Sequence, residues 1–210
     1  MSNNPIGPFK ITGVFMDATP DCWTNQDSVI KYKDQWDFFY HHNDLSPHFD
    51  KNSSISIDCM FFNHEGTINK VTLTLRGLEI ANPSSEIQVS RYSLKSNDGA
   101  LIAFLETCNT FEGWKTIFDA LSAWIRFNSV DFRSAVIKSI NVRTLSNTDS
   151  TLTIRLDKAD GPVIATVTIA KNNECSFIHS SLSGFEAGIH NLIVQLKDNR
   201  KVEIDWIKFE

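Results

Sequence analysis

The sequence has few cysteines, no excess of basic residues and no long apolar run. Lys and Arg number 20 against 25 Asp and Glu, a net charge of -5, which argues against a nucleic-acid partner because a phosphate backbone selects a basic face. No stretch of about 18 apolar residues is present, so no membrane span is predicted. The start, Met-Ser-Asn-Asn-Pro, also lacks the charged-then-apolar pattern of a signal peptide.

The cysteines are scattered along the chain and form no Cys-x-x-Cys pair. Their spacing argues against a zinc ribbon or a dithiol redox site. We predict buried or half-buried free thiols rather than disulfides. The four residues are Cys22, Cys59, Cys108 and Cys175.

Short runs with period-two alternation dominate the first part of the chain. Hydrophobic residues make up 41% of the sequence, enough for a packed core. The alternation predicts strands, joined by tight connections at Asp34-Gln35 and His64-Glu65-Gly66. The predicted strands are Phe9–Phe15, Ser28–Tyr32, Trp36–His41, Ser54–Phe61 and Thr67–Leu75.

A second group of strand-like runs follows Asn82-Pro83-Ser84-Ser85, a polar and proline-containing boundary. Their spacing of roughly ten residues is typical of an all-β sandwich. We read Gly113–Leu121 as loop and short strand, and predict two domains, 1–81 and 82–210. The further strands are Glu86–Ser93, Leu101–Glu106, Trp124–Phe132, Val136–Thr144, Ser150–Asp157, Val163–Ile169, Ser176–Ser181, His190–Lys197 and Val202–Phe209.

Five segments of the first part carry a family resemblance: Asn4–Phe9, Thr24–Val29, Lys33–Ser46, Ser53–Asp58 and Asn63–Ile68. They resemble the C-terminal end of the five-bladed β-propeller of glycoside hydrolase family 43, enzymes that act on xylan and arabinan. The resemblance implies that this part is an incomplete domain, the last blade, and that upstream blades are its partner. A lone blade has an apolar face that needs a neighbour.

The second part carries two specific motifs, Gly188-Ile189-His190 and the terminal Asp205-Trp206-Ile207-Lys208-Phe209. Weaker pieces accompany them: Ile87–Ser93, Ala123–Phe127, Val130–Phe132, Leu152–Asp157 and Gly161-Pro162. In this order and spacing the second part resembles a family 6 carbohydrate-binding module, a β-jelly roll often attached behind family 43 enzymes. The expected fold is therefore all-β, with a last propeller blade packed beside a β-sandwich. We assign Trp124, Phe127, Trp206 and Phe209 to the sandwich core.

No residue of this chain is predicted to be catalytic. Glycoside hydrolysis needs two carboxyl groups that flank the scissile bond, and in family 43 they come from earlier blades. Gln26 stands where that family has a histidine, and Ser53 where it has an arginine. His41 and His42 point to opposite faces of a strand, so we expect one at the core edge and one exposed rather than a shared metal ion.

The resemblance to family 6 implies a sugar cleft with two aromatic platforms and an asparagine. Counting along the motifs places Phe118 at the first platform, and Glu174 or Cys175 at the second, where no aromatic stands. Glu203 takes the asparagine position. Trp114 is a nearby aromatic that could compensate. For Phe118 and Trp114, ligand contact and core packing both remain open.

The family's structural calcium site matches Gln88, Ser90 and Asp205. Ser90 replaces a glutamate, which leaves one carboxylate of the expected two, and calcium prefers several hard oxygen ligands. We therefore expect the calcium site to be weak or absent.

The chain is thus predicted to be the carbohydrate-binding C-terminal portion of a family 43-like glycosidase, with plant cell-wall polysaccharide as its partner. One alternative is part of an active α-L-arabinofuranosidase or β-xylosidase completed by upstream sequence. Another is an interaction scaffold that uses an unpaired blade edge. The family resemblance implies an extracellular or periplasmic parent protein.

Overall fold

The computed structural model describes residues 1–210 apart from 3, 19–21, 23–24, 46–53 and 134–135. The chain divides into two compact units, Met1–Leu73 and Thr74–Glu210. The sequence-based boundary at Asn82 lies inside the second unit. There Ala81 donates its backbone N–H to Ser129 and accepts from Asp131, so the segment that precedes Asn82 is part of the sandwich.

The described part of the first unit holds an antiparallel sheet in the order β1-β2-β3. Its strands are β1 (Ser28–Tyr32), β2 (Gln35–His42) and β3 (Ser54–Met60), close to three of the predicted ranges. The β1–β2 turn is Lys33-Asp34, and Lys33 has a φ of 53°.

The first unit has a small core on one face of this sheet. Phe38, Tyr40, Met60 and Val71 are buried there, and Phe15 meets Phe38 edge-on at 5.3 Å between ring centroids.

Two predicted strands of the first unit are wrong. Phe9–Phe15 forms no strand, and within Thr67–Leu75 only Ile68 makes a bridge, to Phe62. Each segment instead packs single apolar side chains on the sheet. A backbone hydrogen bond of 2.7 Å, from the Val71 N–H to the Phe15 carbonyl, joins the two segments. Apolar spacing alone does not distinguish such a cover from a ladder strand.

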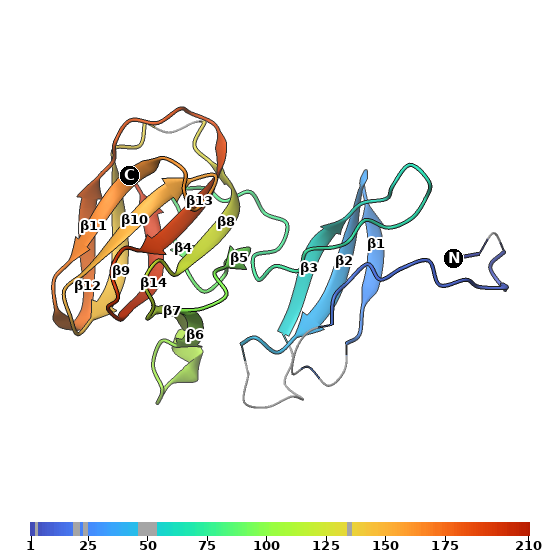
Figure 1. The fold of residues 1–210 in the computed structure, drawn as a ribbon, viewed down its shortest axis with the longest axis horizontal. Coiled ribbons are helices and arrows are strands. Elements are labelled where there is room, and N and C mark those ends of the chain that lie inside the picture. Colours follow the sequence, from blue (N-terminus) through green and yellow to red (C-terminus); the bar gives the residue numbers. More distant parts are fainter. Residues whose placement is uncertain (3, 19–21, 23–24, 46–53, 134–135) are drawn as a thin grey trace. The chain divides into compact units, whose positions relative to one another are not determined.

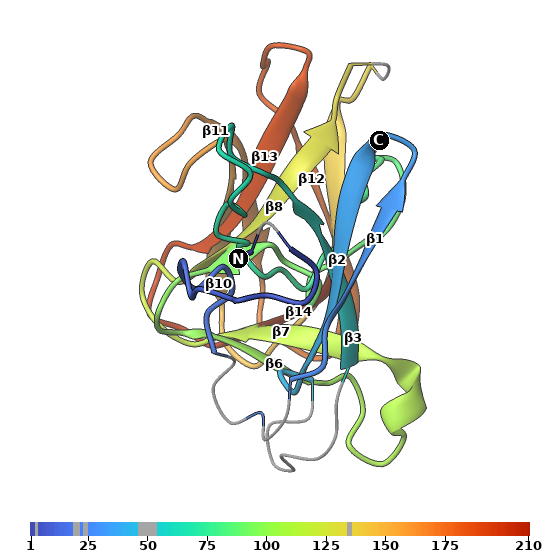
Figure 2. The same ribbon diagram turned by 90° about the vertical axis from the view of Figure 1, so that its right-hand side faces the viewer.

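The second unit is a sandwich of two antiparallel sheets (Figures 1 and 2). Outside residues 134–135, the first sheet has the order β11-β10-β13-β8-β5. It contains β5 (Leu94–Lys95), β8 (Trp124–Asp131), β10 (Ser150–Leu156), β11 (Val163–Ile169) and β13 (Ile189–Leu196).

The second sheet has the order β12-β9-β14-β7-β6, and β4 pairs with β14. A 3-10 turn, Thr110–Glu112, precedes β7. The strands are β4 (Ile87–Gln88), β6 (Ala100–Phe104), β7 (Trp114–Phe118), β9 (Ser139–Ser146), β12 (Asn172–Ser181) and β14 (Val202–Phe209).

The core lies between the two sheets because apolar and polar residues alternate along the strands. β9 alternates half-buried and buried residues throughout its length, so one side faces the core and the other faces outward. Phe127 and Phe209 are fully buried, as predicted, but Trp124 and Trp206 are only half-buried. Trp206 lies outward and contacts Phe177 at 5.7 Å, so its assignment to the core is wrong.

The all-β fold with antiparallel sheets is confirmed. Cys59, Cys108 and Cys175 are free, as predicted; Cys108 and Cys175 are exposed rather than buried. Among the described residues, no helix is long and apolar enough to cross a membrane.

Candidate functional site

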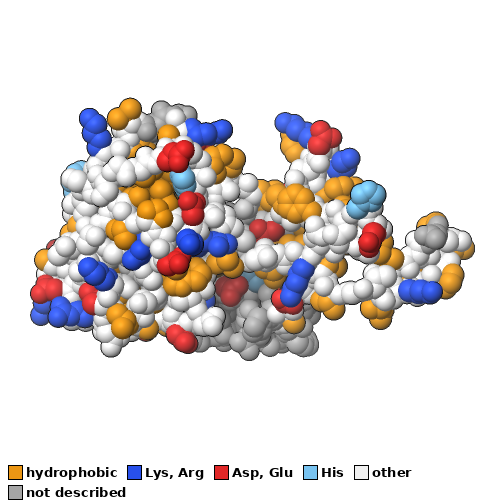
Figure 3. Space-filling view, turned by 45° about the horizontal axis from the view of Figure 1, so that its top comes forward, with side chains coloured by type: hydrophobic (Ala, Val, Ile, Leu, Met, Phe, Trp, Pro, Cys, Tyr) orange, Lys and Arg blue, Asp and Glu red, His pale blue; other side chains and the backbone are white. Residues whose placement is uncertain are grey.

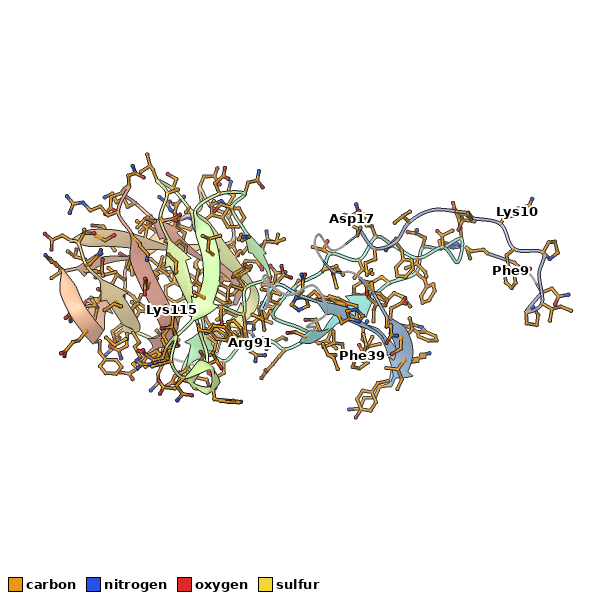
Figure 4. The ribbon with its side chains drawn as sticks, turned by 90° about the horizontal axis from the view of Figure 1, so that it is seen from below. Phe9, Lys10, Asp17, Phe39, Arg91 and Lys115 are labelled. Atoms are coloured by element: carbon orange, nitrogen blue, oxygen red, sulfur yellow. The ribbon has the colours of Figure 1, made fainter. Side chains whose placement is uncertain are left out.

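A cleft of about 190 Å³ lies on the outer side of the second sheet; we call it the sheet cleft. Strands β7, β9, β12 and β14 contribute to it together with the segment after β6, and Lys115 of β7 is labelled in Figure 4. Its lining is mostly polar and carries both signs of charge: Leu105, Glu106, Thr107, Lys115, Arg143, Thr144, Leu145, Cys175, Glu203 and Asp205.

Strand alternation and one bulge bring the charged groups to the cleft. Glu203 lies between the buried Val202 and Ile204, so its side chain leaves the sheet on the outer side. Between Ile204 and Trp206 the pairing of β14 with β9 shifts register. An extra residue on one strand re-aims its side chain, and Asp205 is thereby turned into the cleft beside Glu203.

Glu203 is the central anion of the cleft. Lys115 Nζ lies 2.7 Å from one of its carboxylate oxygens, and Lys201 Nζ lies 2.9 Å from the other. Burial raises the pKa of Glu203, but the hydrogen bonds and charges of Lys115 and Lys201 together outweigh burial and leave it lowered. Glu203 is therefore a charged acceptor flanked by two ammonium donors.

Asp205 is held differently, because Arg143 alone neutralises it. The guanidinium of Arg143 donates to the Asp205 carboxylate. Burial raises the pKa of Asp205 and the nearby charge of Glu86 adds to this, while the Arg143 hydrogen bond and charge lower it; the net direction is upward. Within one cleft, two carboxylates thus have pKa values shifted in opposite directions.

Two of the predicted sugar-contacting residues lie away from the cleft lining. Phe118 is fully buried in the sandwich core; of the two roles left open for it, its burial supports core packing. Trp114 stacks on Phe104 with ring centroids 4.1 Å apart, so one face of its indole is already covered.

The other two predicted sugar residues lie in or beside the cleft. Glu203 lines it, and Glu174 precedes Cys175, which also lines it. Glu174 is exposed on β12, where the pairing with β9 shifts register between Asn172 and Ser176. This irregularity places Cys175, without an aromatic ring, at the cleft wall.

The residues matched to the calcium site do not form a suitable donor set. Asp205 supplies the one carboxylate, and Arg143 already holds it. Ser90 is buried and offers a neutral hydroxyl, and Gln88 lies across the β4–β14 ladder from Trp206. Calcium prefers several anionic oxygens, so these residues do not fit the ion. The described residues contain no cluster of three or more His, Cys, Asp and Glu that could hold a metal.

The histidines on β2 have separate surroundings, but neither is exposed, so the prediction of one exposed histidine is wrong. His42 is buried, with its Nδ1 2.7 Å from Asp44 and its Nε2 2.9 Å from the Ser56 hydroxyl. His41 is half-buried and accepts the backbone N–H of Gln26 at 3.2 Å. Ser53, the other departure from the family 43 pattern, lies outside the described residues.

Sequence reasoning missed Lys115 and Arg143 as site residues. Both stand at outward, half-buried positions of strands whose inward residues are buried, WKTIF and SINVRTLS. A long charged side chain inside a buried strand pattern is the signal that could have singled them out.

The second unit is thus an antiparallel β-sandwich with a polar cleft on one sheet, the form of a ligand-binding module. The family model described as carbohydrate binding module (family 6) matches residues 93–210. The match covers more than half of the chain, and the chain belongs to this family. A search of curated proteins gives no match.

Similar solved structures agree on the fold. A glycoside hydrolase family 43 arabinoxylan arabinofuranohydrolase from Bacillus subtilis, in complex with cellotetraose, matches 99% of this chain with a TM-score of 0.63 and 19% identity. The match covers 46% of that enzyme, so this chain spans less than half of its length.

Two single modules match the second part of the chain. A CBM6 module from Clostridium stercorarium, in complex with cellobiose, matches 63% of this chain and 97% of its own, with a TM-score of 0.56 and 17% identity. A family 6 module from Clostridium cellulolyticum, in complex with xylose, is similar over 62% of this chain and 99% of the module, with a TM-score of 0.55 and 22% identity. At these identities the likeness concerns the fold.

Proposed function

We propose that the chain binds plant cell-wall polysaccharide of the xylan or arabinan class through the sheet cleft. The observation that carries the proposal is the alternation of acceptors and donors in one cleft: Glu203 against Lys115, and Asp205 against Arg143. Lys201 binds Glu203 from beside the cleft. Sugar hydroxyls both donate and accept hydrogen bonds, so a lining with both functions suits them. The aromatic platforms expected for the family are not part of the lining, and polar contacts carry the binding.

The complexes of the similar structures support this ligand class. They contain cellobiose, xylose and cellotetraose, sugars of the kind that make up plant cell walls. The proposal extends that chemistry to this chain on the basis of family membership and the polar cleft.

Isothermal titration with xylan, arabinoxylan and cello-oligosaccharides tests the proposal. Glu203→Gln and Arg143→Gln should each weaken binding about tenfold, because each removes a charge-assisted hydrogen bond. Lys208→Gln is the matched control: Lys208 is on β14 but pairs with Glu210 at 3.0 Å and does not line the cleft. No heat with any glycan, or cleft variants that bind like the unchanged protein, would refute the proposal.

We further propose that the first unit is the last blade of a family 43-like propeller and that the chain is the C-terminal portion of such a glycosidase. Exposed apolar side chains on this unit support the need for neighbouring blades; orange side chains are visible on it in Figure 3. They include Phe9, Ile11 and Val14 of the N-terminal segment and Ile55 of β3.

Glycosidase assays distinguish a non-catalytic C-terminal portion from an active enzyme. The catalytic carboxylates are expected on the upstream blades, so the pure chain should release no arabinose or xylose from p-nitrophenyl glycosides. Adding a polypeptide that carries those blades should produce activity. Release of sugar by this chain alone would show that it contains a complete catalytic pair.

A further inference from the structure

A second pocket of about 220 Å³ lies within the Thr74–Glu210 unit, apart from the sheet cleft and without a role in the function proposed above. We call it the arginine pocket. Arg76 and Arg91 line it together with Glu79, Glu86, Gln88 and the Asn82–Ser85 turn. Arg91 is labelled in Figure 4.

Backbone hydrogen bonds hold both walls of the arginine pocket against the sandwich. Ala81 is bonded in both directions to the β8 end, and the Ser85 N–H donates to the Asn82 carbonyl at 3.1 Å. On the other wall, the Val89 N–H donates to the Asp205 carbonyl at 2.9 Å and the Arg91 N–H to the Gln88 carbonyl at 3.1 Å. A preformed pocket loses little conformational entropy when a ligand binds.

The two arginines of this pocket are not ion-paired. Arg76 Nη2 donates to the backbone carbonyl of Glu79 at 3.0 Å rather than to a carboxylate. No ion pair among the described residues includes Arg76 or Arg91. Burial lowers the pKa of Arg76, while the charge of Glu79 partly offsets this. Arg76 is therefore half-buried, and the charge of Glu79 offsets its burial only in part.

The remaining lining residues decide which anion fits. Glu79 and Glu86 would repel doubly charged phosphate more strongly than a singly charged carboxylate, and they accept hydrogen bonds from hydroxyls. Gln88 and Asn82 can both donate and accept hydrogen bonds. The pocket therefore suits a ligand that joins one carboxylate to several hydroxyls. Guanidinium groups bind carboxylates in a bidentate manner.

We propose that the arginine pocket binds the uronic-acid substituents of an acidic polysaccharide, with the carboxylate at Arg76 and Arg91 and the hydroxyls at Glu79, Glu86 and Gln88. The inference rests on the saccharide-binding function proposed above and names a second, charge-selective site for it. The chain would thus engage neutral sugar in the sheet cleft and a charged branch in the arginine pocket.

Titration of the ¹⁵N-labelled full chain with methyl β-D-glucuronide, followed by NMR, tests this inference. The neutral control ligand is methyl β-D-glucoside, which lacks the carboxylate of the glucuronide. We expect glucuronide-dependent shifts of the Arg76 and Arg91 Nε–H signals, absent with the glucoside. Raising NaCl from about 50 to about 500 mM should weaken the binding, because salt screens the charge pair.

Variants locate the site. Arg91→Gln, at an exposed position that should leave the fold intact, and Arg76→Gln should each weaken glucuronide binding about tenfold or more. Arg200→Gln is the matched control, because Arg200 binds the Asp149 carbonyl outside the pocket. Equal binding of glucoside and glucuronide, binding unaffected by both pocket variants, or equal binding of inorganic phosphate would overturn the inference.

The two proposals fail in different ways. Loss of xylan binding in Glu203→Gln with intact glucuronide shifts at Arg91 supports both sites. Glucuronide shifts at Arg91 without any binding of neutral glycan would remove the proposed function of the sheet cleft and keep the arginine pocket. Glucuronide shifts confined to Lys115 would overturn the arginine pocket alone.

Discussion

At the residue scale, Glu203 shows how one carboxylate organises a cleft. An amide at this position would be neutral, whereas the carboxylate brings in Lys115 and Lys201. The three groups neutralise one another in part, so the cleft gains polar contacts and strong local order. The proposed binding function and the stability of the cleft therefore involve the same side chains.

The lowered pKa of Glu203 predicts a pH-dependent contribution to stability. The lowered folded-state value means that the stabilisation is fully present above the unfolded-state pKa and is lost as pH falls through the folded-state pKa. Glu203→Gln should lower the free energy of unfolding by about 1–3 kcal/mol at neutral pH, because two lysines lose a partly buried partner. The difference from the unchanged protein should shrink in acid.

Urea unfolding between neutral and acidic pH measures this effect. Glu65→Gln, in the exposed His64–Gly66 turn, is the control and should follow the unchanged protein at every pH. A Glu203→Gln deficit that stays constant across the range would show that the ion pairs are not its cause.

The surroundings of Asp205 lead to a second prediction at the residue scale, that calcium does not stabilise the folded protein. Since Arg143 holds its carboxylate and Ser90 offers only a neutral hydroxyl, calcium should leave Tm unchanged relative to EDTA. Binding to the folded state would raise Tm by mass action. A rise in Tm with calcium but not with magnesium would contradict the poor fit of the donor set.

At the element scale, β14 connects the core to both pockets. Its inward residues Val202, Ile204, Ile207 and Phe209 are fully buried, while Glu203 and Asp205 line the sheet cleft. Its pairing with β4 also holds Gln88, which lines the arginine pocket. A loss of packing on one side of this strand is expected to move residues on the other.

Ile204→Ala tests the role of β14 in the core. Removing a fully buried side chain should lower the free energy of unfolding by about 2–5 kcal/mol through lost burial and a residual cavity. The control Ile189→Ala removes an exposed side chain from the start of β13 and should cost about 0.5 kcal/mol or less. Denaturant unfolding gives both values; similar costs for the two would contradict the packing argument.

At the scale of the whole molecule, the two units differ greatly in core size. The sandwich core draws on nearly every strand of the second unit, whereas the first unit buries Phe38, Tyr40, Met60 and Val71. Small cores give marginal stability. The exposed apolar residues of the first unit are consistent with a surface that requires a neighbour.

The fragment 74–210 should therefore fold alone, with a cooperative thermal transition and native near-ultraviolet circular dichroism. Fragment 1–73 should show little tertiary signal, because its apolar surface has too little core to pack against. An unfolded 74–210 fragment would show that the second unit depends on the first for its stability.

The sequence predicted the sandwich well, because its strands follow a simple rule of alternation. In the sandwich, β11 and β14 have the predicted bounds, and β8, β9, β10, β12 and β13 differ from theirs at the ends. In the first unit, β1 also has the predicted bounds. The rule failed for Phe9–Phe15, where Phe15 packs on the sheet without a backbone ladder. It also failed for Trp206, where a bulge changes which face a residue occupies.

The sequence by itself determined the all-β class, the membership of the carbohydrate-binding family and the position of Glu203 in its C-terminal motif. Only the tertiary structure decided that Phe118 is buried, that Lys115 and Arg143 join Glu203 and Asp205, and that Arg76 and Arg91 line one pocket. The physical reason is that strand periodicity is local in the chain. A cleft, by contrast, depends on register and bulges between strands that are distant in sequence.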